Sequence, residues 1–532
     1  MLSKLIGLSQ NRIFQLFVVL LSITFYFLFS FGKFDLFPSD EDVYFQTGLL
    51  FKLPYLEFGN LLYPMGIYIL SFFVSNTINL AYSYFFLLSI TMFLALLWYL
   101  KKYSGSFWAS YFIAACFLFS DFQVSLQPRI TILNLIFGLF FLGLIANKRP
   151  LYANWGIISV GLLLCNYVSR PEFYWFFLIA TIIFVFQTTK SKEITLNKKI
   201  IALSAFGVFV AIFYFIGGGI NEPGKLKVAF IQHFFDNYQI WTGKSFDYDE
   251  EFIVFDKIYG KVNSDIELIT ANPSFFFKHV LFNFKNYFLA ILKIFKSCFY
   301  DVFVIFFHNK TKYVFTIFIF LLFIGVDFKQ TLQNFWNILK AYYPKFPYLA
   351  VFMLPTFVAV LLVFPRYHYT ILHLPFYFLL LVFLFVSLKF RTPKLKNITL
   401  VLFIVCYFWG VIAHYPSRIK LPSHVGFYRY MSQMANGKKL NLLSNDYFGF
   451  NYYKTNYTKT SWEVSKTDLA KLVNTQKFDL ITFYQMDLEV ADNRKFVSEG
   501  YKSTNYIRIE KFEGIKRYIF VKPELEAKFK TQ

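Results

Sequence analysis

The sequence predicts a mostly α-helical, polytopic membrane protein with about eleven transmembrane helices and a small C-terminal extracytoplasmic α/β domain. Of its 532 residues, 57% are hydrophobic and only 16% are charged, whereas soluble proteins carry roughly 25% charged residues. Long apolar runs alternate with short turns rich in Lys and Arg. The chain becomes more polar beyond Tyr415. We therefore divide it into a transmembrane part, residues 1–414, and a separate tail, residues 415–532.

The charge balance supports this division. The chain has 53 Lys and Arg against 31 Asp and Glu, a formal net charge of +22. In a soluble domain this excess would suggest a nucleic-acid partner, but here many cations lie in short turns between apolar runs. That pattern is typical of cytoplasmic loops. It predicts a multi-pass protein of the inner or plasma membrane with no nucleic-acid partner.

The first apolar run, residues 13–31, follows Lys4 and Arg12 and has no small-residue cleavage site. We interpret it as a retained anchor with a cytoplasmic N-terminus. The direction of each later run follows from the basic turns beside it. Further spans are predicted at residues 82–100, 107–120, 131–146, 151–166, 173–186, 200–216, 313–326, 351–364, 370–388 and 398–414.

Two long external segments, residues 32–81 and 217–312, separate some of these spans. The second contains an apolar stretch at residues 275–299 that is interrupted by four lysines. Counting this stretch as a span would place the basic residues 329–345 outside. We therefore predict that it lies along the outer membrane surface.

The C-terminal tail has strand-like runs at residues 440–443, 478–483 and 518–521. A helical pattern at residues 466–473 separates the first two. These patterns predict a small α/β domain, which lies outside the cell membrane if the last span runs outward.

No metal site or other cofactor is predicted. Cys116, Cys165, Cys298 and Cys406 lie far apart in apolar surroundings, without a C-x-x-C motif, as expected for packing residues. The histidines, including His233 and His373, have no partner at ligand spacing. A divalent metal stays an open alternative that ligand spacing does not support.

Three consecutive carboxylates, Asp40, Glu41 and Asp42, follow the first apolar run. Ionised side chains are costly near hydrocarbon, and adjacent carboxylates repel one another. Their presence there indicates water, a cation or a polar substrate. A solvated acidic loop outside the membrane is the alternative.

Five short patterns occur in order along residues 13–388: Asp40-Glu41 followed by Tyr44, Tyr63-Pro64, Gln127-Pro128-Arg129, Arg170-Pro171-Glu172, and Pro365-Arg366-Tyr367 with Pro375. Together with the topology, they resemble the GT-C glycosyltransferases, in the ArnT-like and protein O-mannosyltransferase-like branch (glycosyltransferase family 39-like). Relatives often carry an acidic residue beside the arginine of the third pattern. Here no acid closely follows Arg129, and Asp121 precedes it, which argues against a two-carboxylate metal site.

The resemblance implies an inverting transfer of sugar from a polyprenyl-phosphate donor to a lipid, glycan or protein acceptor on the extracytoplasmic face. Asp40 would act as the base, and Glu41 would orient it or bind sugar hydroxyls. Arg366, with Arg129 and Arg170 as secondary candidates, would bind the donor phosphate. The donor or acceptor pocket would be lined by Asp42, Tyr44, Tyr63, Tyr367 and His368.

Simpler roles stay open for the same residues. Arg366 and the aromatic residues could be interfacial anchors, and Arg170 could pair with Glu172. A lipid-linked glycan polymerase or ligase is a second functional class, although residues 217–273 contain no Arg. A transporter or flippase is a third class. The polar residues lie mainly at predicted helix ends, and no internal repeat is evident, which disfavours that class.

Overall fold

The structure is a computed structural model that describes residues 11–33, 40–51, 61–120, 130–217, 226–244, 251–262, 265–300, 324–392, 440–444, 457–460, 469, 473–474, 478–484, 491–509 and 517–524. The chain divides into two compact units. The first comprises Met1–Phe29, Lys52–Tyr63 and Phe85–Arg418, and the second comprises Ser30–Phe51, Pro64–Tyr84 and Ile419–Gln532.

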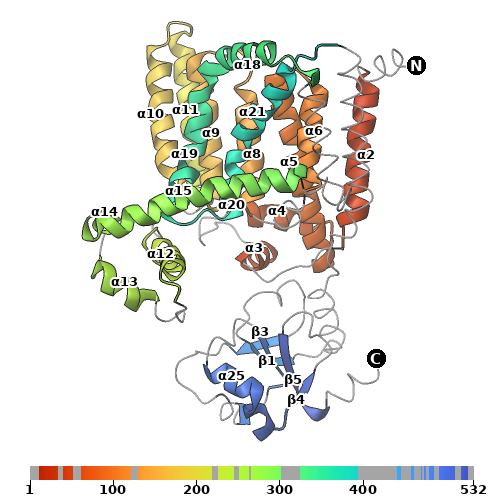
Figure 1. The fold of residues 1–532 in the computed structure, drawn as a ribbon, viewed down its shortest axis with the longest axis vertical. Helices are drawn as coiled ribbons and strands as arrows, with labels where there is room; N and C mark the ends of the chain where they lie inside the picture. The colour runs from red at the N-terminus through yellow and green to blue at the C-terminus, as the bar shows by residue number, and fades with distance from the viewer. Residues whose placement is uncertain are drawn as a thin grey trace. The chain divides into compact units, whose positions relative to one another are not determined.

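The first unit is a bundle of apolar helices that stand side by side (Figure 1). Neighbouring helices along the chain run in opposite directions, and α9 packs against both α8 and α10. The bundle contains α2 (Arg12–Ser30), α5 (Thr77–Ser104), α6 (Phe107–Leu118), α8 (Ile130–Leu144), α9 (Leu151–Ser169), α10 (Phe173–Lys190), α11 (Leu196–Ile216), α19 (Phe346–Leu362) and α21 (Leu374–Ser387).

Within the described ranges, six segments are long and apolar enough to cross a membrane: Arg12–Ser30, Thr77–Ser104, Leu151–Val168, Phe173–Lys190, Leu196–Ile216 and Phe328–Leu362. The prediction of a polytopic membrane protein is confirmed at this level. The count of about eleven spans is not confirmed. Predicted spans in α6, α8 and α21 correspond to apolar helices of 10–17 residues, which reach at most about 26 Å at 1.5 Å per residue. Residues 398–414 and most of residues 313–326 lie outside the described residues.

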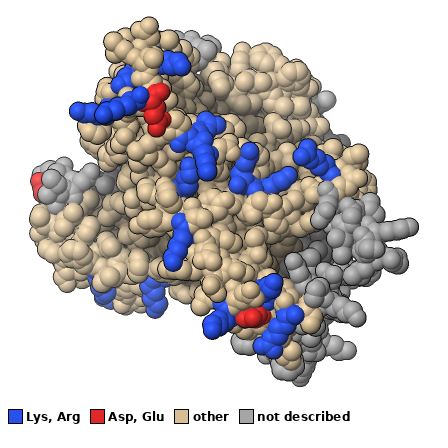
Figure 2. Space-filling model, turned by 90° about the horizontal axis from the view of Figure 1, so that it is seen from above, with Lys and Arg blue, Asp and Glu red and all other residues tan. Residues whose placement is uncertain are grey.

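The basic turns gather at one end of this bundle. The Lys345 ammonium donates to the carbonyl of Asn147 at 3.3 Å, which joins the turn before α9 to the start of α19. The Asp327 amide donates to the carbonyl of Lys389 at 2.8 Å. Figure 2 shows Lys and Arg dominating the charged side chains of the face seen from above. We call this end the basic end.

Two helices lie across the bundle, one at each end (Figure 1). At the basic end, α18 (Phe328–Tyr342) leads through the short helix η4 (Tyr343–Lys345) into α19. At the opposite end lies α15 (Pro273–Phe295). It begins where the Asn272 side chain accepts the Phe275 amide at 3.2 Å, a helix N-cap followed by a proline at the first turn. It continues into η2 (Lys296–Tyr300).

Three shorter helices precede α15: α12 (Leu226–Thr242), α13 (Glu251–Tyr259) and α14 (Asp265–Ala271). They share an apolar core with the start of α15, formed by Phe230, Phe234, Phe255, Tyr259, Leu268 and Phe276, among others. Most of the described part of residues 217–312, which the sequence predicted as a long external segment, is therefore helical. Aromatic residues spaced three and four apart in this segment form that core.

The second unit contains α3 (Asp40–Leu49), most of α4 (Leu62–Ser71) and the C-terminal sheet. The strands are β1 (Leu440–Ser444), β2 (Tyr457–Thr460), β3 (Leu480–Tyr484), β4 (Ile507–Ile509) and β5 (Arg517–Val521). Their order is β2-β1-β3-β5-β4. Strands β1, β2 and β3 are parallel, and β5 is antiparallel to both β3 and β4.

This sheet packs on α25 (Ala491–Ser498) and η7 (Gly500–Ser503) around buried Ile481, Phe483, Phe496 and Phe520. The three predicted strands correspond to β1, β3 and β5. Strands β2 and β4 were missed because both are edge strands of only four and three residues, too short for a clear pattern. The predicted helix at residues 466–473 falls mostly outside the described residues.

Candidate functional site

The candidate site lies at the end of the bundle opposite the basic turns. Three segments reach this end: the start of α8, the turn between α9 and α10, and residues 363–373 after α19. Arg170 ends α9 with φ −120° and ψ 79°, because the following Pro171 disfavours the helical conformation before it. The chain then turns through Glu172 into α10. Arg170 is thereby fixed at the rim of the bundle.

Arg170, Glu172 and Tyr369 form what we call the Arg170 cluster. The Arg170 Nη1 atom lies 3.5 Å from Glu172 Oε1, and their side chains are 9% and 18% exposed. The guanidinium carbon lies 4.3 Å from the centroid of the Tyr369 ring, a cation–π contact. Burial raises the pKa of the Glu172 carboxyl above its ordinary value, and the adjacent Arg170 offsets part of that rise. The predicted alternative, a pair between Arg170 and Glu172, is present.

Several buried polar atoms near this end have no hydrogen-bond partner among the described residues: Arg170 Nε, Thr131 Oγ1, and both amide atoms of Asn134. Thr131 and Asn134 lie one turn apart near the start of α8. The backbone carbonyl of Asn134 accepts from the Cys165 thiol of α9 at 3.8 Å. Leaving such a group unpaired costs about 1–3 kcal/mol. These side chains are therefore suited to bind hydroxyl or phosphate oxygens.

Arg366 has a different environment. It follows α19 and precedes α20 (Tyr367–Thr370) and η5 (Ile371–His373). Its carbonyl accepts the amides of Tyr369 and Thr370 at 3.0 and 3.2 Å, which begins α20. Its side chain is exposed, and among the described residues it has no recorded hydrogen bond or ion pair. Arg366 is thus an open cation in the same segment as Tyr369.

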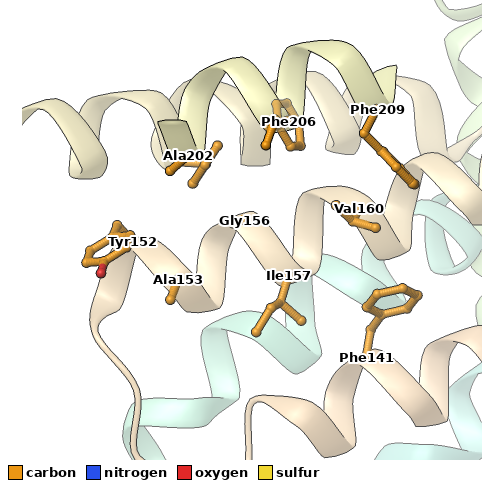
Figure 3. A pocket seen from close by; sticks show the side chains of 11 residues that line it. Phe141, Tyr152, Ala153, Gly156, Ile157, Val160, Ala202, Phe206 and Phe209 are labelled. Carbon is orange, nitrogen blue, oxygen red and sulfur yellow. The ribbon is translucent and has the colours of Figure 1, made fainter. Parts of the chain in front are cut away.

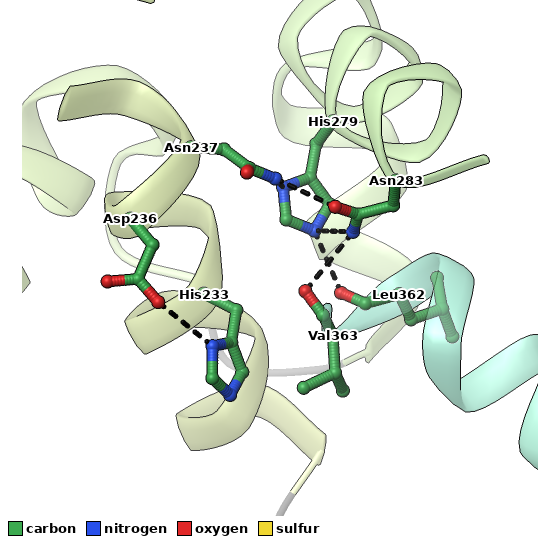
Figure 4. A network of polar contacts seen from close by, with 7 residues as sticks. All are labelled: His233, Asp236, Asn237, His279, Asn283, Leu362 and Val363. Carbon is green, nitrogen blue, oxygen red and sulfur yellow. Dashed lines mark hydrogen bonds and ion pairs between the residues drawn. The ribbon is translucent and has the colours of Figure 1, made fainter. Parts of the chain in front are cut away.

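The segment that carries Arg366 is held by a polar network (Figure 4). We call Asn237, His279 and Asn283 the α19 clamp. Asn283 Nδ2 donates to the carbonyls of Leu361 and Val363 at 2.9 and 3.1 Å. His279 Nε2 donates to the carbonyl of Leu362 at 3.0 Å. The last carbonyls of a helix lack partners within the helix, so two side chains of α15 satisfy the end of α19.

Asn237 of α12 completes the clamp. Its Nδ2 donates to Asn283 Oδ1 at 2.9 Å and to His279 Nδ1 at 3.0 Å. Because Nδ1 accepts and Nε2 donates, His279 is a neutral imidazole with its proton on Nε2. Burial lowers its pKa to about 4, and the nearby His233 contributes to the decrease. The three side chains are fully buried and form a fixed support.

A histidine and carboxylate pair lies beside the clamp. His233 Nδ1 lies 3.1 Å from Asp236 Oδ2, with the histidine side chain 6% exposed and the carboxylate 52% exposed. The His233 ring stacks on Phe364 with a centroid distance of 6.1 Å. This contact ties α12 to the residues just before Arg366.

The other predicted site residues are less completely described. Asp40, Glu41 and Asp42 form the first turn of α3, but their side chains lie outside the described part. Tyr44 is partly buried, and Tyr63 is 1% exposed. Arg129 lies outside the described residues, immediately before α8. Tyr367 and His368 belong to α20, without described side chains.

The α19 clamp was missed from the sequence. His279 and Asn283 are four residues apart and therefore share one face of α15. That spacing was the available signal. Nothing in the sequence indicated that their partners would be the backbone carbonyls of residues 361–363, about 80 positions away.

A separate open groove of about 450 Å³ lies among α8, α9, α10 and α11. Figure 3 shows Tyr152, Ile157 and Val160 of α9 below Ala202, Phe206 and Phe209 of α11. Its lining is almost entirely apolar, so it is suited to hydrocarbon rather than to a charged group.

Among the described residues, no group of three or more His, Cys, Asp or Glu side chains could hold a metal ion. No protein-family model, curated protein or solved structure matches the chain.

Proposed function

We propose that this protein is an integral-membrane glycosyltransferase that moves a sugar from a polyprenyl-phosphate donor to a lipid, glycan or protein acceptor. The main support is the position of two arginines at the end of the bundle opposite the basic turns. Arg366 is exposed, and Arg170 is buried between Glu172 and Tyr369 with its Nε atom lacking a partner among the described residues. Such a site can bind an anionic phosphate and sugar hydroxyls at a membrane surface.

The proposed reaction is a single displacement. The acceptor hydroxyl attacks the anomeric carbon and gives its proton to Asp40, while the bond from that carbon to the phosphate oxygen breaks. The polyprenyl phosphate leaves with the electron pair, and Arg366 stabilises its charge. The assignment of Asp40 and Glu41 comes from the family resemblance, whereas Arg170 and Arg366 are also supported by geometry.

The proposed orientation follows from the basic end. Turns rich in Lys and Arg face the cytoplasm in multi-pass proteins. The Arg170 end would then be extracytoplasmic, where polyprenyl-phosphate sugars act as donors. The protein would lie in an inner or plasma membrane. The predicted outward span at residues 398–414 would then carry the C-terminal domain to the extracytoplasmic side.

The test is transfer of radiolabelled sugar from a panel of polyprenyl-phosphate donors by purified protein. We expect turnover with one donor, at least a 100-fold loss in Asp40→Asn, and a comparable loss in Arg366→Gln. Lys148→Gln is the matched control at the basic end and should retain activity. Thermal unfolding would show whether each variant is folded.

Three outcomes would contradict parts of the proposal. Full activity of folded Asp40→Asn would remove Asp40 as the base. Full activity of Arg366→Gln would remove the phosphate role of Arg366. An absence of turnover with every donor would contradict the glycosyltransferase proposal and favour a polymerase, ligase or transporter.

A further inference from the structure

The helix α15 exposes a row of large apolar side chains. Phe277, Leu281, Phe284, Phe288 and Leu292 have exposed fractions from 43% to 66%. Successive members are mostly three or four residues apart, so they follow one side of the helix. A soluble surface rarely exposes an apolar row of this kind.

Lysines occupy the adjacent side of the same helix. Lys278, Lys285, Lys293 and Lys296 are all exposed, and each helical residue advances about 100° around the axis. By this spacing the lysines lie to one side of the apolar row rather than within it. Lys278 also lies 4.5 Å from the centroid of the Trp241 ring. The helix therefore presents an apolar strip with a cationic margin.

The third side of α15 faces the bundle. It carries His279 and Asn283 of the α19 clamp, and also Tyr287, whose hydroxyl hydrogen-bonds that of Tyr377 at 3.0 Å. The axis of α15 runs across the bundle helices rather than alongside them (Figure 1). Its buried side thus fixes α15 to the residues on either side of Arg366.

We propose that α15 docks on the bilayer surface at the Arg170 end and thereby holds the Arg366 segment at headgroup depth. The apolar strip enters the boundary between headgroups and acyl chains, and the lysine margin contacts anionic phosphates. Charge complementarity and continuity with the apolar surface of the bundle favour lipid over a protein partner. Docking requires no catalytic activity, so it can be tested independently of the proposed function.

A spanning orientation is the main competitor. The 23 residues of α15 would extend about 34 Å at 1.5 Å per residue, which is enough to cross the hydrocarbon core. Two orientations predict different depths along the helix. A spanning helix changes depth by about 22 Å between residues 277 and 292, whereas a surface helix keeps one depth.

The experiment uses the full chain in liposomes that contain phosphatidylglycerol, with the four native cysteines replaced by alanine. Single cysteines are introduced at Phe277, Leu281, Phe288 and Leu292 and labelled with a nitroxide. Depth is measured by competition between oxygen and a water-soluble nickel reagent. Labels at Lys285 and Lys293 serve as matched controls on the lysine margin.

We expect the four apolar-side labels to agree in depth within about 5 Å and to lie about 5–10 Å below the headgroup level. The two lysine-margin labels should be accessible to the nickel reagent. A steady change of about 22 Å would overturn the proposal in favour of a span. Full water access at all six positions would overturn it in favour of a protein partner or a second copy.

A label at Arg366→Cys tests the second half of the proposal. It should lie within about 5 Å of the depth at Phe288. A label more than about 10 Å deeper would overturn the link between α15 and the Arg366 segment. Each variant is compared with its cysteine-free parent by thermal unfolding, which identifies variants that fail to fold.

Discussion

The two ends of the helical bundle use charge in opposite ways. At the basic end, lysines lie in short turns or at the start of helices and are exposed, as at Lys192 and Lys198. At the other end, polar groups are buried and hydrogen-bonded, as in the α19 clamp, or buried beside a single counterion, as in Arg170. Solvated charges contribute little to stability, whereas removing one partner of a buried pair is costly.

The polar groups at the two ends therefore differ in how strictly their positions are determined. In the proposed orientation the exposed lysines mark the cytoplasmic end, and any nearby position would serve equally well. The buried groups depend on atomic geometry, because each donor faces one defined acceptor. Substitutions should therefore have large effects at the Arg170 end and small effects at the basic end.

The largest effect is expected for Arg170→Gln. It leaves the Glu172 carboxyl without its counterion and removes the contact with Tyr369, so the free energy of unfolding should fall by about 3 kcal/mol. Sugar transfer should fall at least 100-fold. Denaturation in mixed micelles measures the first quantity.

The double variant Arg170→Gln with Glu172→Gln is the matched control. With both charges removed, part of the lost stability should return, because no uncompensated charge stays buried. If the loss of stability in the double variant equals or exceeds the sum of the losses in Arg170→Gln and Glu172→Gln alone, the two side chains do not stabilise each other as described.

Acidification should weaken the α19 clamp and lower the free energy of unfolding by about as much as Arg170→Gln does. The pKa of His279 is about 4 in the folded protein and 6.5 in its ordinary state. Between these values the unfolded chain binds a proton that the folded chain excludes. The contribution of His279 to stability is therefore constant above about pH 6.5 and falls by about 3 kcal/mol as the pH decreases to 4.

The check compares the pH dependence of unfolding in the parent protein and in His279→Gln. The variant should show a shallower loss between pH 6.5 and 4, while other histidines contribute equally to both proteins. Identical slopes would show that His279 titrates normally.

These contrasts explain which features could be predicted from the sequence. Apolar runs with basic turns depend only on local composition, and six of the predicted spans correspond to candidate spans. Strands β1, β3 and β5 were predicted for the same reason. Helices α12 to α14 were not predicted, because their shared aromatic core forms by contact between separate helices rather than within one stretch of sequence.

The site was predictable only in part. Arg170 and Arg366 were predicted from the resemblance of Arg170-Pro171-Glu172 and Pro365-Arg366-Tyr367 to family motifs, and the structure places both at the same end of the bundle. The pairing of Arg170 with Tyr369 and the clamp of α19 join positions far apart in the sequence. No local pattern encodes such contacts.

A smaller loss is expected for Asn283→Leu. The substitution keeps the branched shape of the side chain but leaves the carbonyls of Leu361 and Val363 without their donor, at a cost of about 2 kcal/mol. The Arg366 segment should become less fixed. A nitroxide at Arg366→Cys would report this as faster motion, and Asn334→Leu is a control because Asn334 makes one longer bond of 3.4 Å to the carbonyl of Ser387. Unchanged motion at position 366 would limit the clamp to a role in stability.

The smallest effect is expected at the basic end. Lys192→Gln with Lys198→Gln removes two exposed cations, and the free energy of unfolding should change by less than about 0.5 kcal/mol. Sugar transfer should also be unchanged, since these side chains lie at the end of the bundle opposite Arg170. A loss as large as that of Arg170→Gln would mean that charge at the basic end contributes to folding as strongly as the buried pair does, and the contrast between the two ends would then be wrong.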